Sequence, residues 1–97
     1  MKVYAVIDEY YDYDYSTDSD FNMELFGTLE DAEMYFEVKK EECFEHYLDR
    51  YGVDSTEELI NDCFEEYDED VNYMRYEIYD DCSECIYIKE YDIMSFK

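Results

Sequence analysis

The chain has 97 residues, of which 30 are Asp or Glu and seven are Lys or Arg, so its formal net charge at pH 7 is −23. Disordered acidic segments contain few aromatic residues, whereas this chain has 14 Tyr and 6 Phe. The composition excludes a simple acidic tail and indicates one small domain, residues 1–97, with a modest core. A homodimer is one arrangement that would enlarge so small a core.

The N-terminal third of the chain has the pattern of two strands. Residues 2–9 alternate with a period of two and are rich in strand-forming residues. A polar stretch, residues 10–20, separates them from a second alternation at residues 21–25, which predicts a strand antiparallel to the first. Residues 1–9 hold one Lys and a short apolar run, unlike a signal peptide or a membrane span. A cytoplasmic location with reduced cysteines is therefore expected.

A long helix should follow Gly27. Thr28 has the character of an N-cap, and Gly52 supplies a C-terminal stop after Tyr51. At 100° per residue the apolar side chains fall on one arc. The arc consists of Leu29, Ala32, Phe36, Cys43, Phe44, Tyr47 and Tyr51.

A second helix is predicted to start at the capping box of Ser55 and Glu58 and to end near Glu69. Residues 72–80 and 85–94 have strand patterns, joined by the polar connection 81–84. The order ββααββ predicts an α+β fold, an antiparallel sheet with two helices packed on one face. Sheet order cannot be deduced, and the helices are long enough to allow a parallel contact between the first and last strands.

Acidic residues recur every four positions on both predicted helices. Like charges at this spacing destabilise an isolated helix by about 0.2–0.5 kcal/mol per pair, so stability alone does not favour them. A solvated face is the ordinary interpretation, but such faces interleave Lys with Glu, and these helices hold only Lys39, Lys40 and Arg50. The residues expected to bind a basic partner here are Glu37, Glu41, Glu45, Asp49, Glu58, Asp62, Glu65, Glu66, Asp68, Glu69 and Asp70.

The loop Asp12, Tyr13, Asp14 and Tyr15 is a further candidate for binding that partner. In an extended segment, alternation places carboxylates on one edge and phenol rings on the other, which suits an Arg-rich groove. An acidic loop with half its tyrosines lying on the sheet is the equal alternative.

Metal and catalytic sites receive weaker support. The alternate acids of residues 12–20 resemble the start of an EF-hand loop, but Thr17 replaces the turn Gly and Met23 the bidentate Glu. Cys82 and Cys85 are weak zinc candidates that would need two further ligands, such as Cys43 and His46. Neither a catalytic residue nor a cofactor is predicted, and we expect no enzyme.

The acidic rows, with the Tyr and Asp loop, resemble the DNA-mimic inhibitors of bacteriophages and mobile elements, the anti-CRISPR and anti-restriction proteins. The segment 26–36, after two strands, is similar to a strand-to-helix junction of small phage proteins. The resemblance implies an inhibitor that blocks the nucleic-acid channel of a Cas effector or restriction enzyme in the host cytoplasm and binds no nucleic acid itself. The alternatives are an immunity-like acidic module that binds a basic toxin and an adaptation to high salt.

Overall fold

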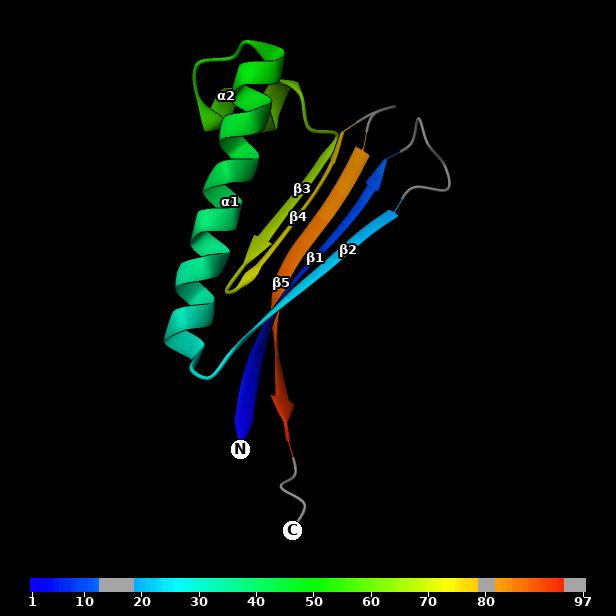
Figure 1. Cartoon of the computed structure of the whole chain (residues 1–97). Helices are drawn as coiled ribbons and strands as arrows, with labels where there is room; N and C mark the ends of the chain where they lie inside the picture. The colour runs from blue at the N-terminus through cyan, green and yellow to red at the C-terminus, as the bar shows by residue number, and fades with distance from the viewer. Residues whose placement is uncertain (13–18, 79–81, 94–97) are drawn as a thin grey trace.

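The computed structural model describes residues 1–12, 19–78 and 82–93. Its elements are strands β1 (Lys2–Asp12) and β2 (Ser19–Phe26), helices α1 (Leu29–Tyr51) and α2 (Thr56–Asp62), and strands β3 (Glu66–Asp70), β4 (Tyr73–Ile78) and β5 (Cys82–Asp92). The strands form one sheet in the order β2-β1-β5-β4-β3. Both helices lie on the same side of this sheet (Figure 1). The α+β prediction is confirmed, with one strand more than expected.

Strand β1 is paired with a neighbour on each side. It is antiparallel to β2, as predicted, with Tyr4 opposite Phe26. It is also antiparallel to β5, with Lys2 opposite Asp92 and Asp12 opposite Cys82. A parallel contact between the first and last strands is therefore wrong. The reason is the additional strand β3, which reverses the direction in which β4 and β5 run.

The ends of α1 are fixed by local chemistry. The Thr28 hydroxyl accepts a hydrogen bond from the Asp31 N–H at 3.2 Å, which satisfies one of the free donors of the first turn. Gly52 adopts a left-handed conformation with φ of 65° and ends the helix. Both predicted ends are confirmed because they depend on residues within one turn of the boundary.

The second helix is shorter than predicted. The Ser55 hydroxyl accepts from the Glu58 N–H at 3.1 Å, as expected of its N-cap, but α2 ends at Asp62. Acids at a helix C-terminus oppose the macrodipole, whereas in β3 they meet a cation, since Asp68 lies opposite Arg75. The acid-rich segment after Cys63 therefore forms a strand. A two-residue turn with Asn72 at φ of 56° leads into β4.

The core lies between the helices and one face of the sheet. From α1, Ala32, Phe36, Phe44 and Tyr47 are buried, whereas Leu29, predicted on the same arc, is 40% exposed. The sheet contributes Val6, Met74, Tyr76, Ile78, Cys82 and Ile86, and the α2 region contributes Leu59 and Phe64. The Phe64 and Tyr76 rings stack with centroids 4.8 Å apart.

No described element covers the opposite side of the sheet, which we call the open face. Side chains alternate between faces along a strand, so Ile7 and Met23 point to the open face while Val6 points to the core. Among the described residues, no helix is long and apolar enough to cross a membrane.

Candidate functional site

Helix α1 carries one of the predicted rows of acids on its exposed surface. Glu37, Glu41, Glu45 and Asp49, which we call the acidic row, are all exposed. None of the four is ion-paired to a described residue. At a rise of 1.5 Å and a turn of 100° per residue, each carboxylate lies about 6 Å further along the axis and about 40° further round than the last. The row therefore winds slowly around the helix in the right-handed sense.

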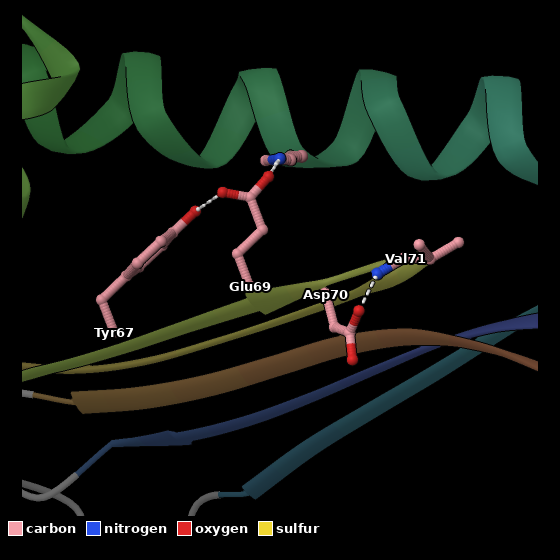
Figure 2. Close-up of polar contacts among 5 residues, drawn as sticks. Tyr67, Glu69, Asp70 and Val71 are labelled. Carbon is pink, nitrogen blue, oxygen red and sulfur yellow. Dashed lines mark hydrogen bonds and ion pairs between the residues drawn. The ribbon is translucent and has the colours of Figure 1, made fainter.

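The lysines of α1 do not neutralise this row because they face the sheet. The Lys40 ammonium donates to the Glu69 carboxylate of β3, and Figure 2 shows that carboxylate between Tyr67 and helix α1. The Tyr67 hydroxyl donates to the same carboxylate at 2.9 Å. The bond from Lys40, followed by that from Tyr67, lowers the pKa of Glu69. Lys39 lies over the Tyr35 ring, 5.7 Å from its centroid.

The second predicted row is not a helix face. Glu58 and Asp62 lie on α2, Glu65 lies between α2 and β3, and the remaining acids lie on β3. Glu66 accepts from Arg75 at 3.1 Å, and Glu69 is held by Lys40. Asp68 and Asp70 are exposed on the open face of this edge strand. The structure therefore distributes these residues over α2 and β3 and not along one helix, and two of them have cationic partners within the fold.

The predicted loop site falls mostly outside the described residues. Asp12 ends β1, and Tyr13, Asp14 and Tyr15 lie outside the part of the chain that is described. The same holds for most of the series that resembles an EF-hand. Its last member, Asp20, is exposed on β2.

The cysteine pair cannot bind one zinc ion together. Cys82 and Cys85 both lie on β5, three residues apart, so their side chains project from opposite faces of the sheet. Cys82 is fully buried in the core, whereas Cys85 lines a hollow on the open face. Among the described residues no three His, Cys, Asp or Glu side chains are grouped to hold a metal.

A polar cleft that the sequence did not indicate lies between α1 and the central strands. It has a volume of about 280 Å³. Its lining consists of Asp8, Tyr10, Lys39, Glu42, Cys43, His46, Tyr47, Glu84 and Ile86. Asp8 lies on the core side of β1, on the same face as Val6, and its cross-strand partner on β5 is Ile86. Glu84 lies two residues before Ile86 on β5 and therefore on the same face. Backbone pairing of segments far apart in the sequence thus brings two carboxyl groups together.

A chain of hydrogen bonds extends from this cleft into the core. The Tyr76 hydroxyl donates to Glu84 Oε1 at 2.6 Å, and its oxygen lies 3.1 Å from that of Tyr47. The Tyr47 hydroxyl lies 3.0 Å from Cys82 Sγ, and the Cys43 thiol donates to Glu84 at 3.5 Å. Glu84 is therefore the acceptor on which the buried hydroxyl and thiol groups converge.

The environment of Asp8 favours its protonated form. Burial first, then the hydrogen bond and charge of Glu84, raise the pKa of Asp8 from 3.8 to about 8. The positive charge of Lys39 acts in the opposite direction, and the charge of Asp20 adds to the rise. The buried Asp8 Oδ1 has no hydrogen-bond partner among the described residues. Asp8 and Glu84 thus form a carboxyl pair that holds one proton near neutral pH.

The same environment argues against nucleophilic chemistry by Cys43. Cys43 and His46 both line the cleft, as a thiol and imidazole dyad would require. However, burial followed by the charge of Glu84 raises the pKa of Cys43 well above its ordinary value. Since the thiolate is the nucleophile, the arrangement disfavours the reactive form. The cleft can store a proton but does not activate this thiol.

Asp8 is the one member of this site that the sequence could have indicated. It is one of the alternate residues of the first strand that face the core, and its neighbours in that series, Val6 and Tyr10, pack in or against the core. A carboxyl group in such a position requires a partner. Comparisons with family models, curated proteins and solved structures find no match to this chain.

Proposed function

We propose that this protein is a non-enzymatic inhibitor that places the acidic row of α1 in the nucleic-acid channel of a host defence nuclease, such as a Cas effector or a restriction enzyme. One observation carries the proposal. The four carboxylates of the row are exposed and unpaired with any described residue, in a chain of net charge −23. A partner with regularly spaced Lys and Arg would supply the missing counter-charges.

The geometry of the row is compatible with partial imitation of a phosphate strand. Phosphates on one strand of B-DNA rise about 3.4 Å per step, with about 10 steps per turn. The acidic row rises about 6 Å and turns about 40° per step. Its turn per step is similar to that of DNA, but its pitch is longer, about 54 Å against about 34 Å, and its axial charge density is about half. The row therefore replaces some phosphate contacts, and its advantage is preorganisation, since no duplex has to be bent or opened.

The experiment compares two variants that lose equal charge. In the row variant, Glu37, Glu41 and Glu45 become Gln and Asp49 becomes Asn. In the control variant the four changed acids are Asp54, Glu57, Asp62 and Glu65, which are exposed around α2. Glu66 and Glu69 are left intact because their cationic partners belong to the fold.

Binding to a panel of purified Cas effectors and restriction endonucleases is measured at 50 and 200 mM salt, with and without a 20-bp duplex. We expect binding that salt weakens and duplex displaces. The row variant should bind about tenfold more weakly or worse, and the control variant should bind like wild type. Equal losses in the two variants would refute the row as the binding site. A partner indifferent to duplex would indicate an immunity-like module instead.

A further inference from the structure

We propose that the outer edge of β2 binds an extended segment of a partner protein by strand addition, and that this segment alternates apolar with basic residues. The proposal rests on β2 and does not depend on the proposed function of α1. Strand addition supplies main-chain hydrogen bonds for affinity and side-chain positions for specificity.

Strand β2 has one paired edge and one unpaired edge. Eight residues pair with β1, from Phe26 opposite Tyr4 to Ser19 opposite Tyr11. β2 is the first strand in the sheet order, and no described strand pairs with its other side (Figure 1). A row of backbone N–H and C=O groups is therefore directed away from the sheet, as a template for another strand.

The two edges of this sheet are protected to different degrees. At the opposite edge, β3 has five residues and presents acids to the open face, features that discourage pairing with another chain. β2 has eight residues and presents apolar side chains to that face. Phe21 is 60% exposed, Met23 47% and Leu25 56%. Only the β2 edge combines length with exposed apolar surface, which marks it as an interaction site.

The other side of β2 determines the charge of the partner. Asp20, Asn22 and Glu24 alternate with the apolar residues and are exposed on the α1 side. An added strand lies about 4.8 Å from β2, with its side chains beside those of the neighbouring strand. Its residues on the open face would contact the apolar row, and those on the α1 side would meet two carboxylates and an amide. Alternating apolar residues with Lys or Arg satisfy both sides.

A hollow next to Phe21 extends over β1, β5 and Arg75 of β4, on the inner side of β2 and not at its outer edge. It has a volume of about 420 Å³, and its lining includes Glu9, Tyr11, Asp20 and Phe21. Arg75 also borders it, but that guanidinium is paired with Glu66 at 3.1 Å and Glu77 at 3.5 Å. An added strand would lie on the other side of β2, so this hollow is not part of the proposed site.

A second copy of this chain is a poorer occupant of the edge. Antiparallel pairing of two β2 strands about Asn22 would place Asp20 of each copy opposite Glu24 of the other, and like charges directly opposite destabilise a sheet. Each copy also carries a net charge of −23. Low-salt conditions should therefore keep the edge free of a second copy and available to a basic segment.

The test uses two nine-residue peptides of equal composition, one with Lys and Val alternating and the other with the same residues in blocks. Amide hydrogen exchange followed by NMR reports which backbone groups become protected. We expect the alternating peptide to protect amides of β2, and the block peptide to bind at least about tenfold more weakly. Met23→Thr combined with Leu25→Thr should weaken binding to a similar degree while keeping β propensity. The row variant of α1 serves as the matched control and should retain the protection of β2.

Three results would overturn the inference. Equal binding of both peptides would show charge attraction without strand pairing, and protection confined to α1 or β3 would place the site elsewhere. Protection of β2 without peptide, together with a dimer in sedimentation at 1 M salt, would assign the edge to a second copy. Because the readout is local to β2, failure here and failure of the row on α1 are distinguishable.

Discussion

Replacing Asp8 with Asn should make the protein less sensitive to pH in the neutral range. The pKa of Asp8 rises from 3.8 to about 8 on folding because of burial and the adjacent Glu84. Between these values the folded state binds a proton that the unfolded state does not. Stability from this group is complete below about pH 4 and is lost as the pH rises toward 8.

The size of the effect follows from the width of that window. One unit of pKa difference corresponds to about 1.4 kcal/mol, so the slope approaches about 1.4 kcal/mol per pH unit. Between pH 5.5 and 8 the free energy of unfolding would fall by up to about 3 kcal/mol from this group. The amide that the substitution introduces cannot ionise and keeps the shape of the protonated carboxyl. The free energy of unfolding of Asp8→Asn should therefore not show this fall between about pH 5.5 and 8, and the stability of the variant relative to wild type should increase with pH.

Urea unfolding followed by circular dichroism, from pH 5.5 to 8.5, measures both proteins under the same conditions. Taking the difference between them removes the general repulsion among the other carboxylates. Asp62→Asn, on the exposed last turn of α2, is the control and should run parallel to wild type. If Asp8→Asn also runs parallel to wild type, the carboxyl pair does not hold a proton in the folded state and the reasoning fails.

Three further experiments test the packing, the end of α1 and the strand assignment. Leu59→Ala should destabilise the protein by about 2–5 kcal/mol, because Leu59 is fully buried; a loss below about 1 kcal/mol in urea unfolding would contradict its place in the core. Gly52→Ala should cost about 1 kcal/mol, since Gly52 holds φ of 65° with open space around it, and an unchanged unfolding midpoint would argue against that conformation. In native alkylation of the Cys43→Ser, Cys63→Ser double variant, Cys85 should react well before the buried Cys82; equal rates would refute their placement on opposite faces.

The elements that could be predicted from the sequence are those fixed by nearby residues. The cap at Thr28, the apolar spacing of α1 and the stop at Gly52 lie within one helix, and the structure reproduces both ends and the apolar arc except for the exposed Leu29. β3 could not be predicted in the same way. Its apolar content is limited to Tyr67, and its stability comes from pairing with β4 across a two-residue turn. Acids that looked like a helical row were therefore assigned to the wrong element.

The same distinction between nearby residues and long-range strand pairing applies to the candidate sites. The acidic row was predictable because spacing on one helix determines which side chains share a face. The carboxyl pair of Asp8 and Glu84 depends on the register of β1 against β5, which no local pattern specifies. Cys82 and Cys85 were predicted as a possible metal-binding pair because the start of the last strand was placed three residues too late. With the strand starting at Cys85 the two thiols could share a turn, whereas with β5 starting at Cys82 they are on opposite faces.

Salt separates the contributions of the two proposed surfaces if one partner uses both. Contacts of the acidic row are between exposed charges and should weaken within the physiological range of ionic strength. Strand addition at β2 includes contacts with the carboxylates of Asp20 and Glu24, which salt weakens. Its main-chain hydrogen bonds and its apolar contacts with Phe21, Met23 and Leu25 are screened little. For a partner that used both surfaces, the binding free energy would have one part that is sensitive to salt and one part that is resistant to it. Neutralising the row should then remove its share of the first part and leave protection of the β2 amides unchanged.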